Sequence, residues 1–564
     1  MHRSYRGLAG ALLVVALATG AAACGGGSSS SSSSTSSGGA TGNEGGGKKG
    51  GTATVLMGTA PDYLDPQRGY TTQAAEATWL SYLGLYTYAH KGGTDGGKVI
   101  PGLAQDFPQV SNGGKTYTMT LRKGMKYSDG SPVKASDFRF TIERAIKAPW
   151  GGKSFFTTYI KGAQAFDSGK AESISGIKAS NATGKITIQL TQPYGAFLNV
   201  LAFPSAGFVP TGTKQSNLTN NPPPGVGPYT IKNVVPNRSF SVVRNPNWTD
   251  TTIPGVPAGK MDINVKIATN TQTEAEQVLN NQADVFDYGD QLPPSLQAQV
   301  NAQAKDRFAK QNTISTFYFF LNTQTKPFNN QFAREAVNIA VDRRALARLN
   351  GGNFKPTCYF LPEGLVGHPT GPCPYGDPNA APDMAKAKAL LKRSGMAGQS
   401  VTVWGETRSP RKEFINYYTD VLNKLGFKAK SKIIADAQYF PTIGNLKLQP
   451  QTGFADWFQD FPNPSDFYLL MDKNTIQSTN NQNFSQVSDP HIQSELAALN
   501  PVPAEKLDTA GDRWAKLDTY LAQKAYIVAY GQQLNPKFFS NRLNFGAAIF
   551  HPLYGNDWSS LELK

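Results

Sequence analysis

The chain has 564 residues and a formal net charge of +15, from 55 lysines and arginines against 40 acidic residues. Its basic residues are scattered and form no nucleic-acid-binding motif, which argues against DNA or RNA as a partner and favours a solvated basic surface. After residue 23 no apolar stretch is long enough to span a bilayer, and about 510 globular residues exceed what one hydrophobic core organises, so two or more domains are expected.

The first 23 residues are predicted to be an export signal, because two arginines, a short apolar run and four small residues precede Cys24. Residues 24–50 are rich in glycine and serine and are expected to form a flexible tether. A cysteine at the cleavage site followed by such a spacer resembles a bacterial lipoprotein signal, in which Cys24 becomes the lipidated membrane anchor. Ala21 stands where that pattern prefers leucine, so ordinary cleavage and release of a soluble protein stays open. Both alternatives place the protein outside the cytoplasm.

The globular part mixes predicted strands and helices. Alternating apolar residues predict strands at 51–57, 116–122, 185–190, 239–244 and through 433–434. Apolar residues at helical spacing predict a helix capped by Ser136, and further helices at 331–349, 383–394 and 412–425, the last two ending at Gly395 and Gly426. The order is mixed and has no repeat period, which is typical of an α/β protein with several lobes.

Cys358 and Cys373 lie 15 residues apart in a loop rich in proline and glycine. In an exported protein this pair predicts a disulfide, which stabilises the fold by about 3 kcal/mol on the chain-entropy model. A zinc site would need two more ligands and only His368 is nearby, so no metal site is expected. The pairing leaves Cys24 alone, as lipidation requires.

Motifs of known catalytic sites are missing. The sequence contains no Gly-x-Ser-x-Gly elbow and no His-Glu-x-x-His, and its five histidines are widely separated. We therefore expect a protein that is not an enzyme and needs no cofactor. An exported enzyme acting on peptides or cell-wall fragments is the alternative from another class.

A series of segments in fixed order runs through the mature chain. They are 60–66 (APDYLDP), 101–104 (PGLA), 115–132 (KTYTMTLRKGMKYSDGSP), 135–144 (ASDFRFTIER), 225–229 (GVGPY), 244–248 (RNPNW), Asn322 with 327–329 (PFN), 334–343 (REAVNIAVDR) and 457–467 (WFQDFPNPSDF). Together they resemble the extracytoplasmic solute-binding proteins of ABC importers in the oligopeptide/dipeptide/nickel family (solute-binding family 5), over about residues 51–540.

The resemblance implies a bilobal periplasmic-binding-protein fold of the class II type, enlarged by an extra domain. It implies lobe I at 51–90, 190–315 and 530–564, the extra domain at 91–189, and lobe II at 316–529. The two crossover segments are then expected near 317–322 and 527–532. A monomer of this kind encloses a solute between its lobes, and its closed form docks on the permease of the importer.

The resemblance also implies site residues. In peptide-binding members the aspartate three residues after the tryptophan of the last segment holds the peptide's α-amino group, and Asp460 and Trp457 match that pattern. Phe461 would complete an aromatic pocket around this carboxylate. The alternative is that Asp460 caps a turn before Pro462 while Trp457 lies in the core.

Other pocket residues are less directly indicated. Arg408 lies in a segment that resembles the one where dipeptide binders place an arginine for the ligand's carboxylate, although an exposed surface arginine would look the same. Tyr63 and Asn322 are further candidates. The predicted solute is a peptide, with a nickel chelate or an oligosaccharide left open.

Overall fold

The computed structural model describes residues 50–564 except 269, 288–290 and 293. The predicted export signal, Cys24 and nearly all of the tether lie outside the described residues. Within the described part of the chain, no helix has the length and apolar character needed to cross a membrane.

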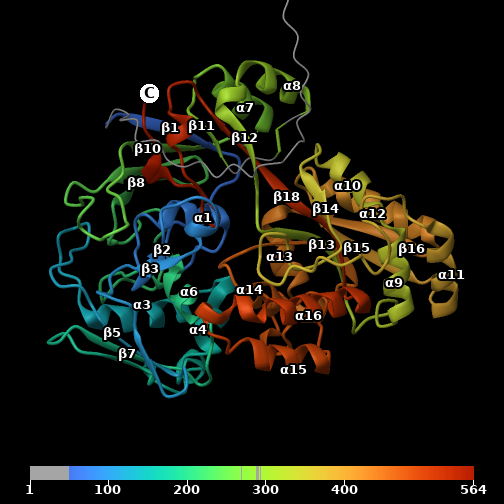
Figure 1. Ribbon diagram of the computed structural model, residues 1–564, viewed down its shortest axis with the longest axis horizontal. Helices are drawn as coiled ribbons and strands as arrows, with labels where there is room; N and C mark the ends of the chain where they lie inside the picture. Colours follow the sequence, from blue (N-terminus) through green and yellow to red (C-terminus); the bar gives the residue numbers. More distant parts are fainter. Residues whose placement is uncertain (1–49, 269, 288–290, 293) are drawn as a thin grey trace, which may run out of the picture. The chain divides into compact units, whose positions relative to one another are not determined.

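Twelve strands form one continuous sheet, and β18 joins its two parts (Figure 1). The strands are, in order, β16 (Lys428–Ile434), β15 (Ser400–Glu406), β17 (Thr452–Phe458), β13 (Ser315–Leu321), β18 (Ile527–Phe539), β11 (Val285–Asp287), β1 (Thr52–Met57), β10 (Asp262–Ile267), β9 (Ser239–Arg244) and β8 (Tyr229–Val235), with β12 (Phe308–Asn312) and β14 (Phe354–Pro356) also paired to β18.

The 13-residue strand β18 changes partners along its length. Its first part pairs with β13 and β14, and its last part pairs with β12 and β11. The chain passes from β12 to β13 through residues 313–314, where the Gln532 side chain donates to the carbonyl of Thr313 (2.8 Å). We call residues 50–312 and 534–564 the first half, and residues 315–533 the second half. The first crossover therefore lies just before the predicted segment, because Phe317 belongs to a fully buried strand of the second half.

The first half also contains a small antiparallel sheet. Its order is β4 (Gln109–Ser111), β5 (Thr116–Thr120), β7 (Lys185–Gln189) and β6 (Ile177–Ala179). Tyr117 of β5 and Ile188 of β7 are buried in one core with Phe138 and Ile142 of helix α3 (Ala135–Lys147). The predicted strands near β1, β5, β7, β9 and β16 are confirmed, and in β5 and β7 alternate residues are buried as the sequence pattern predicts.

Helix α3 begins at Ala135, two residues earlier than a Ser136 cap would require, so that prediction is wrong. The Asp137 carboxylate accepts a hydrogen bond from the backbone N–H of Lys134 (2.9 Å) and closes the first turn. Ser136 lies inside the helix, and its hydroxyl accepts from Asn181. The acidic residue at the third helical position, Asp137, therefore caps the helix in place of the serine.

The helix predicted at 331–349 is two helices, α9 (Gln331–Ala340) and α10 (Arg343–Leu349). The Asp342 carboxylate accepts from the N–H groups of Arg344 and Ala345 and so starts a new helix after an extended break. Helices α11 (Met384–Ser394) and α12 (Arg411–Leu425) end before Gly395 and Gly426 as predicted. Both glycines have a positive φ, which residues with a side chain rarely adopt.

The remaining α-helices, and the strands of two separate two-stranded sheets, complete the fold. They are α1 (Thr72–Thr78), α2 (Gly93–Gly96), α4 (Ser154–Thr157), α5 (Ala163–Asp167), α6 (Phe197–Ala202), α7 (Thr271–Leu279), α8 (Pro294–Gln303), α13 (Asp436–Ile443), α14 (Pro464–Tyr468), α15 (Pro490–Leu499), α16 (Gly511–Lys524), β2 (Tyr86–Tyr88), β3 (Val99–Pro101), β19 (Phe550–His551) and β20 (Gly555–Asn556). Each half has its own large core, and a third, small core lies under α7 and α8.

A buried ion pair ties two of the ordered segments together in the first half. Arg144 of α3 donates from both terminal nitrogens to the two carboxylate oxygens of Asp65, at 2.6 Å each. The side chains are 1% and 0% exposed. The APDYLDP and ASDFRFTIER segments therefore share a structural role, since neither charge could be buried without the other.

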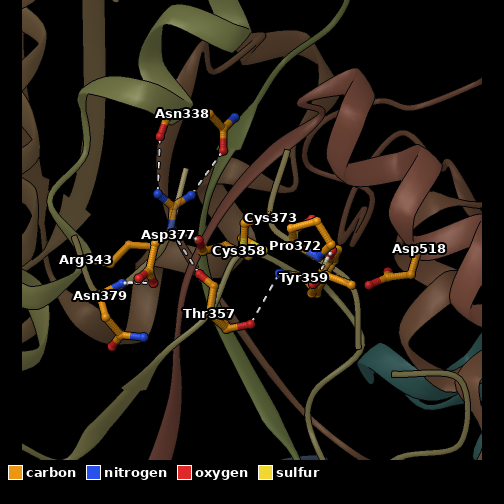
Figure 2. The surroundings of a disulfide bond; sticks show 12 residues. Asn338, Arg343, Thr357, Cys358, Tyr359, Pro372, Cys373, Asp377, Asn379 and Asp518 are labelled. Atoms are coloured by element: carbon orange, nitrogen blue, oxygen red, sulfur yellow. Dashed lines mark hydrogen bonds between the residues drawn. A yellow bond between two sulfur atoms is a disulfide. The ribbon is translucent and has the colours of Figure 1, made fainter. Parts of the chain in front are cut away.

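The predicted disulfide between Cys358 and Cys373 is confirmed, with Cα atoms 6.0 Å apart (Figure 2). The Tyr359 hydroxyl donates to the carbonyl of Pro372 (2.9 Å), which holds the two ends of the loop together beside the disulfide. The buried Asp518 carboxylate accepts from the two successive N–H groups after Tyr359. These contacts fasten the loop to helix α16.

A thiol-labelling experiment checks this disulfide in the mature protein. A thiol reagent added under denaturing, non-reducing conditions is expected to modify neither Cys358 nor Cys373, and to modify both after reduction. Peptide mass spectrometry separates these sites from Cys24. Stoichiometric labelling of both cysteines before reduction would contradict the pairing.

Candidate functional site

A cavity of about 760 Å³ lies between the two halves. Its volume falls in the range of small-molecule sites. The first half contributes residues that include Asp62, Tyr63, Arg68, Tyr70, Trp150, Phe286, Asp287 and Lys537, and the second half contributes residues that include Phe317, Glu406, Arg408, Arg411, Phe414, Asp456, Trp457, Phe458 and Asp460. Charged and aromatic side chains thus face one cavity from both sides.

Asp460 lies in the short connection between β17 and α14, where the chain leaves the sheet of the second half. The Tyr70 hydroxyl of the first half donates to its carboxylate (2.8 Å), although the two residues are 390 positions apart. The backbone N–H of Asp460 donates to the carboxylate of Asp466 (2.8 Å). Asp460 is therefore held from both halves at the cavity wall.

The surroundings of Asp460 favour a positively charged partner. Burial raises the pKa of the Asp460 carboxyl to about 7. Burial, and then the nearby Asp460, raise the pKa of Asp466 well above its ordinary value. Two carboxyl groups in a poorly solvated site gain most from a cation that binds in the cavity.

An aromatic wall stands beside this carboxylate. The ring of Tyr70 lies 5.6 Å from that of Trp150 and 6.5 Å from that of Trp457, measured between centroids. All three residues line the cavity. Such a wall can contact apolar side chains of different shapes without requiring one of them.

A second charged group lines the second half of the cavity. Arg411 donates to Glu406 and to Asp456, both at 2.6 Å, and its guanidinium lies over the ring of Phe454. Burial raises the pKa of Glu406. Arg408, three residues earlier, is half-buried and lines the same cavity.

The first half contributes a third group. Asn556 donates from its backbone N–H to Glu76 (2.8 Å) and from its side chain to Asp287 (2.7 Å). Burial raises the pKa of Glu76 well above its ordinary value and lowers the pKa of Lys537. Asp287 and Lys537 line the cavity, so these two residues contribute charged groups to the part of its wall that belongs to the first half.

Of the residues predicted from the sequence, Asp460, Trp457, Arg408 and Tyr63 line the cavity. Phe461 is buried in the core of the first half, where its ring lies 5.8 Å from that of Phe155. It thus connects the halves beside the cavity and is absent from the cavity lining.

Asn322 lies away from the cavity. It is fully buried, its side-chain amide donates to the carbonyl of Pro450 (2.9 Å), and its side-chain oxygen accepts from the N–H of Gln324 (2.9 Å). Both polar atoms are used in a turn after β13. The position of Asn322 beside the crossover suggested a pocket residue, but its hydrogen bonds give it a structural role.

Sequence reasoning missed Tyr70, Arg411, Glu406 and Lys537. Nothing in the local pattern distinguishes them from surface residues. Tyr70 follows closely on the 60–66 segment, and Glu406 and Arg411 flank the predicted Arg408. In the described part of the chain, no group of three or more His, Cys, Asp or Glu side chains is arranged to hold a metal ion.

Comparison with known proteins decides the family. Residues 98–479 match the family model described as "Bacterial extracellular solute-binding proteins, family 5 Middle". The chain belongs to this family. Family 5 proteins bind solutes outside the cytoplasm and are not enzymes, which confirms the predicted family and the predicted lack of catalysis.

Individual proteins similar to this family 5 protein support the family assignment. The periplasmic murein peptide-binding protein MppA of Escherichia coli K12 is 26% identical over 481 residues, 79% of this chain and 82% of MppA. The structure of "Clavulanic acid biosynthesis oligopeptide binding protein 2" superposes with a TM-score of 0.82 at 22% identity, over 92% of this chain and 96% of that one. Haemophilus influenzae OppA in complex with RPPGFSPFR gives a TM-score of 0.74 at 20% identity, over 92% and 99%. The predicted bilobal periplasmic-binding-protein fold is thereby confirmed, with the small antiparallel sheet as its addition.

Proposed function

We propose that this family 5 protein is a receptor that binds a short peptide between its halves and delivers it to the permease of an ABC importer. The single observation that supports a peptide is Asp460, a partly buried carboxylate in a cavity of about 760 Å³ with aromatic walls. Relatives named for murein peptide and oligopeptide binding support the same solute class. A free peptide offers the ammonium group that such a carboxylate favours.

We assign the peptide's α-amino group to Asp460 and its carboxylate to the side of Arg408. Trp457 and Tyr63 would contact the peptide between these ends. A guanidinium can pair with a carboxylate through two parallel hydrogen bonds. The site would then select for a zwitterion and tolerate different side chains, which is the chemistry of a short peptide.

We further propose lobe I at 51–90, 190–315 and 530–564, the extra domain at 91–189 and lobe II at 316–529. The change of partners along β18 supports a hinge between lobes I and II. The residues of the proposed extra domain share one core with lobe I, which supports their moving together as one rigid body. We propose that the protein acts as a monomer. Ligand would stabilise the closed form, which the permease would recognise.

The solute and the closure can be tested together. Mass spectrometry of material released from the denatured protein is expected to find short peptides. Small-angle scattering is expected to show a smaller radius of gyration with those peptides. The free energy of unfolding should rise by about 2.7 kcal/mol at a hundredfold excess over Kd. Release of an oligosaccharide or a nickel chelate would contradict the peptide assignment, and cleavage of added peptides would contradict a receptor.

We also propose that Cys24 is lipidated and anchors the protein to the outer face of the cytoplasmic membrane. The lone cysteine after a signal-like segment, followed by a Gly/Ser tether, supports this. The Cys24→Ser variant is expected to appear in the medium, while the native protein fractionates with membranes and carries a lipid mass on its N-terminal peptide. Equal membrane retention of both proteins without a lipid mass would contradict the anchor.

A further inference from the structure

The two halves meet at a second place, outside the cavity. The backbone N–H of Gly195, two residues before α6 in the first half, donates to the carbonyl of Asn500, directly after α15 in the second half (2.8 Å). The hydroxyl groups of Tyr194 and Ser465 lie within hydrogen-bond distance (3.2 Å). We call Tyr194, Gly195, Ser465, Asn500 and Val502 the latch. None of them lines the cavity of about 760 Å³.

The backbone approach at the latch leaves no room for a side chain on Gly195. A Cβ atom there would lie 1.7 Å from the carbonyl oxygen of Val502 and 2.6 Å from its carbonyl carbon. The φ of Gly195 lies outside the positive range that disfavours other residues. The neighbouring half alone therefore excludes a side chain, and alanine would fit once the halves separate.

The surroundings of the latch are those of a contact that can open. Tyr194 and Ala196 belong to the core of the first half, and Leu499 belongs to the separate core of the second half. A small cavity of about 30 Å³ with both polar and apolar lining residues lies between the two cores, with room for about one water molecule. The ring of Tyr159 stacks on that of Tyr194 with centroids 3.9 Å apart, so the Tyr194 hydroxyl is held in place from its own half.

We propose that Tyr194 and Gly195 are positioning residues for solute binding, which form a latch made only in the closed form. The inference rests on the proposed function, in which the halves close around a peptide. A contact present only in the closed form raises the fraction of binding-competent molecules and therefore the apparent affinity. Because it forms after the solute has entered, the latch slows release and leaves entry nearly unchanged.

The decisive variant is Gly195→Ala, compared with Gly546→Ala as a matched control. Gly546 also has an ordinary φ, and a Cβ atom there would meet its nearest neighbour at 3.7 Å, an ordinary contact. The probe is a defined pool of unblocked tri- to pentapeptides, followed by small-angle scattering and by dissociation kinetics. Gly195→Ala should need about tenfold or more peptide to close, with a dissociation rate raised by a similar factor and an association rate almost unchanged. Gly546→Ala should match the native protein.

A second variant guards against a folding defect at Gly195. Tyr194→Phe removes only the hydroxyl and should raise the dissociation rate by about two- to fivefold. Closure of Gly195→Ala at native peptide concentrations, with a native dissociation rate, would overturn the latch. If the native protein fails to close with any peptide, the proposed function fails. The latch is then tested by comparing the radius of gyration of the native protein and of Gly195→Ala without ligand. A larger radius of gyration for Gly195→Ala supports it, and identical curves overturn it.

Discussion

Replacing Asp460 with alanine is expected to weaken peptide binding by about 2–5 kcal/mol, because the variant leaves the ligand's ammonium group without its partner in a closed cavity. Asp460→Asn should cost nearly as much, since it keeps the shape of the side chain and loses its charge. Titration calorimetry with one tight-binding peptide measures both. Asp420→Asn is the control, because Asp420 lies on the exposed face of α12 with 61% of its side chain accessible.

Chemical modification of the ligand, combined with Asp460→Ala, gives a thermodynamic cycle. N-acetylation of the peptide should weaken binding to the native protein and have little effect on Asp460→Ala, because each change removes the same charge pair. If acetylation weakens binding to both proteins equally, Asp460 serves the turn before α14 and does not contact the amine.

Peptide affinity is expected to depend on pH through the pair of Asp460 and the ligand's ammonium group. Burial raises the pKa of Asp460 to about 7, and a bound ammonium group requires the ionised carboxylate. Affinity should therefore fall as the pH drops below about 7, by up to about tenfold per unit. Asp466 faces the same carboxylate, and the phenols of Tyr70, Tyr88 and Tyr554 stay neutral because burial raises their pKa values. An N-acetylated peptide should show a much weaker dependence.

Replacing Arg144 with methionine is expected to lower the free energy of unfolding by about 3–5 kcal/mol. The substitution leaves the Asp65 carboxylate fully buried without its bidentate partner, and it also removes hydrogen bonds to the side chain of Gln67 and the carbonyl of Lys214. Urea unfolding followed by circular dichroism measures the loss.

Arg139→Met on the same helix is the matched control. Arg139 is 46% exposed and its nitrogen lies 3.8 Å from Glu143, so its loss should cost under about 1 kcal/mol. The double variant Arg144→Met with Asp65→Leu should recover part of the stability, since it removes both buried charges. Equal stability of Arg144→Met and Arg139→Met would show that the buried pair contributes nothing measurable.

The sequence by itself determined the local elements and the family. Alternation in strands such as β5 and β9, and the glycines that end α11 and α12, encode local backbone geometry that neighbouring residues decide. The ordered segments identified a family 5 protein, and the spacing of Cys358 and Cys373 in a Pro/Gly-rich loop indicated their disulfide.

Tertiary structure alone decided which distant surfaces meet. It brought Tyr70 to Asp460 across 390 residues, buried Phe461 in the core of the first half, and bound the side chain of Asn322 to the carbonyl of Pro450. It also showed that Asp65 and Arg144, from two of the ordered segments, form a buried ion pair in the first half and do not line the cavity. These outcomes depend on how two separate cores pack against each other, and the sequence near a residue does not specify which distant side chain it will contact.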